Sequence, residues 1–223
     1  MYFVTWGEKV VWDIACKARS RHDPARRSFL IAVVGFNILR EVLSFGGSQG
    51  AHAINEAVIN ALPMLRERMP ELRIIHQTGE RDLESAQSAY RNAGIDAEVS
   101  AFIQDMPSYF ARADLVLCRS GASTVGEIAA AGKAAAFVPF PRAADDHQKV
   151  NAQALERAGA AIVLEESSLT SESLTEVVES LFRDPPKLRE MGAAAQKLAH
   201  PNAAQDVAKM AAELVKGKQA VHS

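Results

Sequence analysis

The sequence predicts an α/β protein built on a Rossmann-like parallel sheet. From residue 42 onward, short apolar runs alternate with longer segments of helical periodicity. Two of the apolar runs end in a turn of small residues that leads directly into a helix, at 46–51 and at 120–124. Strands that alternate with helices form a parallel sheet whose two faces are covered by the helices. We therefore expect right-handed crossovers between successive strands and a single domain over residues 42–223.

Six apolar runs have the length of a buried parallel strand, so six strands are expected. They occupy residues 42–45, 72–76, 97–102, 115–118, 134–139 and 160–164. Apolar residues at helical spacing predict the helices that lie between and after these strands. These helices are expected at 51–67, 81–93, 107–113, 125–131, 146–158, 170–182, 185–199 and 202–216.

Several helix ends carry the usual signals. Gly94 and Gly132 follow the last periodic residue of their helices and are expected to end them. Thr170 is a candidate N-cap, and Pro185 is placed to start the helix that follows. Pro63 lies inside the first helix, where it is expected to bend or shorten it.

Residues 1–41 form an irregular N-terminal segment that the pattern does not assign to a domain. The segment 20–27 is basic and resembles a solvated linker. The apolar residues near the N-terminus are interrupted by Glu8, Lys9 and Asp13, which argues against a secretion signal.

The composition is that of a soluble globular protein, with 48% hydrophobic and 23% charged residues. A net charge of −2 gives no reason to expect a nucleic-acid partner. The two cysteines, Cys16 and Cys118, do not make a disulfide framework, so a cytoplasmic location is expected. No His and Cys residues cluster at ligand spacing, and neither a metal nor a cofactor is expected. No apolar run is long enough to span a membrane.

The turn at 120–124 and the helix after it predict an anion-binding site. The first N–H groups of a helix have no partner within the helix and point at whatever lies in front of them. Glu127 is expected in the first turn, where a carboxylate suits the helix dipole and could accept hydrogen bonds from two ribose hydroxyls. An ordinary capped helix explains the same residues equally well.

The stretch Gly46-Gly47-Ser48-Gln49-Gly50-Ala51 repeats this arrangement after the strand at 42–45. A glycine-rich turn of this kind lets the backbone approach a phosphate closely. It is neither a G-x-G-x-x-G fingerprint nor a P-loop, because it lacks the spacing of the first and the lysine of the second. Both turns should open at the carboxyl edge of one sheet, where α/β proteins bind their ligands.

Four motifs in order closely resemble the C-terminal half of the MurG-type glycosyltransferases of family 28. They are Gly46–Ala51, Phe102-Ile103-Gln104-Asp105-Met106, Arg119–Glu127, and Val138-Pro139-Phe140-Pro141 followed by Asp145-Asp146-His147-Gln148 and Asn151. The resemblance implies the C-terminal, donor-binding half of a GT-B fold. It also implies a hexosyl transfer from UDP-N-acetylglucosamine (UDP-GlcNAc) to lipid I, which forms lipid II in peptidoglycan synthesis and so serves the cell wall, cell shape and cell division.

The resemblance also implies roles for individual residues. Ser48 and Gln49, with the backbone of Gly47 and Gly50, would lie beside the diphosphate or the sugar. Ile103 would meet the uracil with its backbone. The remaining donor-site roles fall to Ser123 and Thr124 at the phosphates, Glu127 at the ribose, and Gln148 with the nearby His147 and Asn151 at the donor sugar.

One family motif, Gly-Gly-Thr-Gly-Gly-His, has no match in this sequence. In the family it opens the N-terminal domain, which binds the lipid acceptor, carries the membrane-facing patch and supplies the proposed general base. The resemblance therefore implies that no catalytic residue is assigned in this chain. It implies an N-terminal domain or partner subunit for the lipid-linked acceptor, and peripheral attachment to the inner face of the plasma membrane.

Two other functions remain open at this point. The chain could be a non-catalytic UDP-sugar-binding module or a truncated remnant. It could also belong to another GT-B enzyme, such as a glycolipid glycosyltransferase or a UDP-sugar epimerase, although the motifs Gly46–Ala51 and Asp145–Gln148 argue against this.

Four further residues have competing interpretations. His76 ends a strand and is expected to be a hydrogen-bonded structural histidine rather than a catalytic one. Asp145 and Asp146 precede a helix, which favours capping over an acid pair. Arg119 could face a phosphate or pair with an acid, and the sequence does not choose between these.

Overall fold

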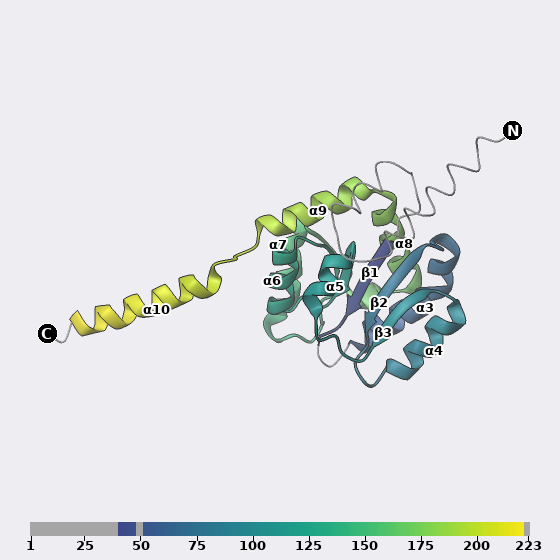
Figure 1. The fold of residues 1–223 in the computed structure, drawn as a ribbon, viewed down its shortest axis with the longest axis horizontal. Helices are drawn as coiled ribbons and strands as arrows, with labels where there is room; N and C mark the ends of the chain where they lie inside the picture. The colour runs from purple at the N-terminus through teal and green to yellow at the C-terminus, as the bar shows by residue number, and fades with distance from the viewer. Residues whose placement is uncertain (1–39, 48–50, 221–223) are drawn as a thin grey trace, which may run out of the picture. The chain divides into compact units, whose positions relative to one another are not determined.

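The computed structural model describes residues 40–47 and 51–220, which hold a parallel sheet with helices on both faces (Figure 1). Contacts divide the chain into residues 1–39 and 40–223. The unassigned segment 1–41 thus lies outside the described residues except for Arg40 and Glu41, which open the first strand two residues earlier than expected.

The six expected strands form one six-stranded sheet in the order β3-β2-β1-β4-β5-β6, and every neighbouring pair is parallel. Their bounds are β1 (Arg40–Phe45), β2 (Leu72–Gln77), β3 (Asp96–Ser100), β4 (Leu115–Cys118), β5 (Ala134–Phe137) and β6 (Ala161–Val163). The sequence-based fold class is confirmed. The strand order reverses between β1 and β4, so the connections leave these two neighbours in opposite directions.

Helices follow each strand as the periodicity predicted. They are α3 (His52–Arg68), α4 (Leu83–Ala93), α5 (Met106–Arg112), α6 (Ala122–Ala131), α7 (His147–Arg157), α8 (Ser171–Arg183), α9 (Pro185–Lys197) and α10 (Ala203–Ala220). Two short 3₁₀ turns, η1 (Ala144–Asp146) and η2 (Glu166–Ser168), lie in the loops after β5 and β6.

The two sides of the sheet carry separate hydrophobic cores. Val42 packs with residues of α3, α4 and α8, whereas its neighbour Leu43 packs with residues of α5, α6 and α7. This alternation is what a strand buried on both faces requires. Helix α9 contributes to both cores, through Met191 on one side and Ala195 on the other.

The predicted helix-end signals work largely as expected. Gly94 and Gly132 take left-handed backbone angles at the ends of α4 and α6. Thr170 caps α8 in a capping box with Ser173. Pro63 lies within α3 without shortening it, because that helix continues to Arg68.

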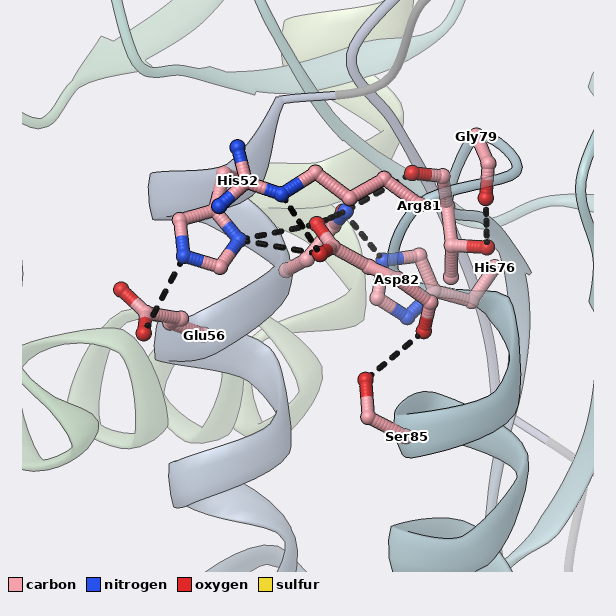
Figure 2. Close-up of polar contacts among 9 residues, drawn as sticks. His52, Glu56, His76, Gly79, Arg81, Asp82 and Ser85 are labelled. Atoms are coloured by element: carbon pink, nitrogen blue, oxygen red, sulfur yellow. Dashed lines mark hydrogen bonds and ion pairs between the residues drawn. The ribbon is translucent and has the colours of Figure 1, made fainter.

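A chain of buried polar groups connects β2, α3 and α4 beneath the carboxyl edge of the sheet. Figure 2 shows the part of it around His76 and Asp82. His76 is fully buried, with Nδ1 3.1 Å from the Tyr90 hydroxyl and Nε2 3.0 Å from Asn55 Oδ1. Asn55 in turn donates from Nδ2 to Asp82 at 2.7 Å. The expectation of a hydrogen-bonded structural histidine is confirmed.

The partners of His76 define its tautomer. Asn55 donates from its nitrogen, so its oxygen must accept, and His76 therefore carries a hydrogen on Nε2. Burial lowers the pKa of His76 to about 4. The nearby Asp82 carboxylate acts to raise this pKa but offsets only part of the effect of burial. Burial also raises the pKa of Tyr90. The neutral His76 thus accepts from the Tyr90 hydroxyl at Nδ1.

Burial of neutral His76 makes stability depend on pH. The unfolded chain takes up a proton on this residue below about pH 6.5, whereas the folded chain resists protonation down to about pH 4. The stabilisation that comes from keeping His76 neutral is therefore fully present above pH 6.5 and is lost as the pH falls toward 4. When the pH is lowered from 8 to 5, we expect the free energy of unfolding of wild type to fall by about 2 kcal/mol more than that of His76→Gln. Urea unfolding of both proteins at the two pH values measures this difference, and equal losses would contradict it.

The packing of α9 against α6 leaves no room for a side chain at Gly192. A Cβ there would lie 2.5 Å from the backbone oxygen of Gly132. We expect Gly192→Ala to lower the free energy of unfolding by about 1–2 kcal/mol, because crowding outweighs the gain in helix propensity. Gly126→Ala in α6 is the matched control, since its Cβ would enter open space, and it should raise stability by up to about 1 kcal/mol. Denaturant unfolding of both variants would show changes in the free energy of unfolding, relative to wild type, that have opposite signs.

Candidate functional site

A cavity of about 720 Å³ opens at the carboxyl edge of the sheet, over the reversal of strand order between β1 and β4. This is the place where doubly wound α/β proteins bind their ligands. Its lining comes from five loops and the helices that follow them: Phe45, Gly46, Gly47, Ala51, His52, Ala53, Arg81, Arg119, Gly121, Thr124, Phe140, Arg142, Gln148 and Glu166.

One wall is the glycine turn between β1 and α3. A Cβ on Gly46 would lie 2.2 Å from the Cβ and backbone nitrogen of Ala51, so only glycine lets the chain turn this tightly. Gly47 has a φ of +88°, which also favours glycine. Helix α3 starts immediately after the turn, and Ala51 at its N-cap offers no side-chain hydrogen bond.

The N-terminus of α6 forms the facing wall. The helix begins at Ala122, three residues earlier than predicted, because nothing after Gly121 prevents the small residues from joining it. Gly121 is the N-cap and offers no side-chain hydrogen bond. Gly121 and Thr124 both line the cavity. The first-turn N–H groups of α6 are therefore placed to meet a ligand, as at other helix N-termini that bind anions.

The early start of α6 corrects the position of Glu127. The first turn of α6 carries no acidic residue, and Glu127 lies in the second turn, exposed to solvent. It does not line the cavity, unlike Gly121 and Thr124. Ser123 is likewise exposed and lies beside, not in, the cavity lining.

Side chains cap α5, α8 and α9, whereas α3, α4, α6 and α7 have no side-chain cap. Asp105 accepts a hydrogen bond from the Ser108 N–H at the start of α5, and Asp184 accepts one from Lys187 at the start of α9. Because the two helices that face the cavity lack such caps, their positive ends are left for a ligand.

Cationic side chains surround the cavity. Arg142 stacks on the Phe140 ring at 5.6 Å, and the Arg81 side chain is 78% exposed. Arg119 instead forms an ion pair with Glu166 at 2.5 Å and donates to the carbonyls of Val138 and Pro139. Of the two partners that the sequence left open for Arg119, the structure shows the acid, while Arg119 also lines the cavity.

His52, the first residue of α3, brings an imidazole to the rim of the cavity (Figure 2). Its Nδ1 lies 2.9 Å from the Asp82 carboxylate, and its Nε2 lies 3.3 Å from Glu56. Burial acts to raise the pKa of Asp82, but the hydrogen bonds from His52 and Asn55 outweigh it, and the pKa is lowered. The ionised Asp82 carboxylate can only accept, so the Nδ1–H of His52 donates to it.

The start of α7 holds the turn before α6 in place. Ser120 donates from its hydroxyl to the Gln148 carbonyl at 2.8 Å, and Asn151 donates to the Ser120 carbonyl at 3.1 Å. The Gln148 side chain accepts from the Phe140 N–H at 3.0 Å while it lines the cavity. His147 is exposed and lies outside the cavity lining.

The expected capping by Asp145 and Asp146 is wrong. Helix α7 begins at His147, and Asp146 at its N-cap makes no side-chain hydrogen bond. Both aspartates have a φ of +51°, whereas an N-cap residue that bonds the first turn needs an extended backbone.

Ile103, which the resemblance placed at the uracil, is buried and its N–H already donates to Gln77 Oε1 at 2.8 Å. The Ile103 N–H is therefore already paired within the protein. Ser48, Gln49 and Gly50 lie outside the described residues, so their predicted roles stay predictions.

The sequence interpretation missed several residues at this site, namely His52, Arg81, Arg142 and Gln77. A signal for Gln77 was present, because it is a polar residue at the end of an apolar strand, on the edge where the ligand was expected. The two arginines lie in loops, where the periodicity carries no information.

No group of three or more His, Cys, Asp or Glu residues that could hold a metal occurs within 40–47 and 51–220. Cys118 lies fully buried in β4, and burial raises the pKa of its thiol. Among the described helices, none combines the length and apolarity that crossing a membrane requires.

Comparisons with known proteins agree with the geometry. Residues 42–207 match the family model described as the glycosyltransferase family 28 C-terminal domain. Curated relatives from Anaeromyxobacter sp. (strain Fw109-5) and Syntrophus aciditrophicus (strain SB) are 47% and 42% identical over 175 and 211 residues. Both are named UDP-N-acetylglucosamine--N-acetylmuramyl-(pentapeptide) pyrophosphoryl-undecaprenol N-acetylglucosamine transferase. The matches cover 78% and 92% of this chain but 46% and 58% of the relatives.

Solved structures give the same picture. The crystal structure of MurG from Acinetobacter baumannii is 41% identical with a TM-score of 0.70, and the match covers 77% of this chain and 49% of that one. The Staphylococcus aureus MnaA-UDP co-structure, at 11% identity and a TM-score of 0.55 over 76% of this chain and 44% of that one, shares the fold alone.

The chain thus spans about half the length of the curated relatives it matches. The family match covers most of the chain and includes both helix N-termini at the cavity. The chain belongs to glycosyltransferase family 28, of which it carries the C-terminal domain.

Proposed function

We propose that residues 42–223 are the UDP-GlcNAc-binding half of a hexosyltransferase that forms lipid II from lipid I. The observation that carries this proposal is the cavity between two uncapped helix N-termini in a domain of family 28. The names of the relatives indicate the donor and the lipid-linked acceptor.

The cavity suits a nucleotide diphosphate in charge and size. Gly46 and Gly47 permit close approach of the backbone to a phosphate, and the starts of α3 and α6 supply N–H donors. Arg81 and Arg142 add positive charge at the rim. A volume of about 720 Å³ falls in the range of small-ligand sites.

The residue roles follow the family resemblance within this geometry. Thr124 and Ser123 would donate to the phosphates, and Glu127 would accept from the ribose hydroxyls. Gln148, with Ser48 and Gln49, would contact the donor end. His147 and Asn151 would act nearby, Asn151 by holding the Ser120 turn.

The chemistry these residues support is stabilisation of the leaving group. As the glycosidic bond to UDP breaks, negative charge grows on the diphosphate, and fixed N–H and hydroxyl donors stabilise it. The general base and the acceptor site are proposed to come from an N-terminal half or partner subunit. The complex would work at the inner face of the plasma membrane.

A second function uses the same site, namely UDP-sugar binding without transfer, as in a regulatory module or a remnant. An assay of GlcNAc transfer to lipid I, with an N-terminal half added to the chain, distinguishes the two functions. Transfer would support the enzyme rather than the binding module.

Calorimetric titration of the chain with UDP-GlcNAc, UDP-glucose and UDP tests the proposal directly. We expect UDP-GlcNAc to bind more tightly than UDP-glucose. Glu127→Gln should weaken UDP-GlcNAc binding by about 10- to 100-fold, because a carboxylate accepts stronger hydrogen bonds from hydroxyls than an amide does.

Glu176→Gln, the same change at an exposed carboxylate of α8, is the matched control and should leave the affinity unchanged. If Glu127→Gln binds as tightly as wild type, the ribose role is wrong. If none of the three nucleotides binds to the wild-type chain, the donor-site proposal itself is wrong.

A further inference from the structure

Gln77 lies between the glycine turn, which lines the cavity, and the loop that holds Ile103, which the family resemblance places at the uracil. It is the last residue of β2, and it is paired in the sheet with Phe45 at the end of β1 and with Ser100 at the end of β3. The chain after Phe45 is the glycine turn, and the chain after Ser100 leads to Ile103. The Gln77 side chain is buried. Because Gln77 lies between the ends of these two strands, its side chain can reach both of the loops that follow them.

Both halves of the Gln77 amide are used. Its Nε2 donates to the carbonyl oxygen of Gly47 at 2.8 Å, and its Oε1 accepts from the N–H of Ile103 at 2.8 Å. These are ordinary lengths for N–H···O hydrogen bonds. The partners also determine how the amide is oriented, because a flipped amide would set oxygen against oxygen and N–H against N–H.

The glycine turn needs such a support. Gly47 has a φ of +88° and follows the last residue of β1, so its carbonyl has no partner in the sheet ladder. Loop backbone without sheet partners depends on side-chain hydrogen bonds. Gln77 supplies one from the rigid end of a central strand.

We propose that Gln77 is a positioning residue for nucleotide binding, which sets the glycine turn and the Ile103 loop at a defined separation. It does not line the cavity, so it acts through Gly47 at the diphosphate end and through Ile103 at the base end. This inference rests on the proposed function, which places a UDP-sugar in the cavity.

The effect follows from the cost of ordering a binding loop. A loop that is already held in its bound geometry loses less freedom when the ligand arrives, so binding is tighter. Without the amide, the Gly47 carbonyl and the Ile103 N–H lose their shared partner, and each binding event must order both loops.

Two variants test the proposal by calorimetric titration with UDP-GlcNAc from pH 5 to pH 8. Gln77→Met keeps the length of the side chain and removes both hydrogen bonds, and we expect at least about tenfold weaker binding at every pH. Gln77→Glu retains the acceptor for Ile103 but can donate to Gly47 only when it is protonated.

The pH profile of Gln77→Glu is the sharpest readout. Burial raises the pKa of a carboxyl group, so the introduced acid should change protonation within or near this pH range. We expect near-wild-type affinity at the acid end and a fall toward the affinity of Gln77→Met at the alkaline end, each compared with wild type at the same pH. Gln104→Glu controls for the added charge, since Gln104 is exposed one residue after Ile103, and it should show no such profile.

The outcomes separate this proposal from the one it rests on. If wild type does not bind UDP-GlcNAc, the proposed function fails and this inference fails with it. If wild type binds and Gln77→Met binds equally well, or loses only thermal stability, Gln77 has a structural role and only the positioning proposal is overturned. Should Gln77→Met not fold, a flat affinity ratio for Gln77→Glu across the pH range overturns the proposal by itself.

Discussion

The parallel pairing of β1 with β2 on one side and β4 on the other is the constraint on which the rest of the domain depends. Parallel strands all end at the same edge, so every loop that follows a strand opens there. The reversal of order beside β1 spreads the helices α3 and α6 to opposite faces of the sheet. The cavity lies over the gap that this arrangement leaves between their N-termini.

Stability and ligand binding make different use of helix ends in this domain. Helices α5, α8 and α9 begin with side chains that satisfy their first N–H groups. Helices α3 and α6 begin with Ala51 and Gly121, which provide no such group. A cap contributes about 1 kcal/mol, and its absence at the two helices facing the cavity leaves donors for an anionic ligand.

Buried polar side chains at the end of β2 connect the sheet to the loops of the site. His76 passes a directed series of hydrogen bonds from Tyr90 to Asn55 and Asp82, and the series reaches His52 at the cavity rim. Gln77, its neighbour in the sequence, points to the other face and joins the glycine turn to the Ile103 loop. Because buried polar groups must be paired, each of these bonds limits where the loop can lie.

The sequence by itself determined the order of strands and helices, since apolar periodicity and glycine positions are local properties of the chain. The six strands, the glycine stops at Gly94 and Gly132 and the cap at Thr170 were all predictable in this way. The two turns that line the cavity were also found, because a turn of small residues between strand and helix is itself a local pattern.

Only the tertiary structure decided which side chains meet. Arg119 pairs with Glu166 from a distant loop, and Gln77 reaches Gly47 and Ile103 across neighbouring strands. Two backbone features could not be predicted for a related reason. Helix α6 starts three residues early, which removes Glu127 from the first turn, and Asp145 and Asp146 have a left-handed backbone. Local propensities there are weak, so packing against the rest of the fold determines the backbone.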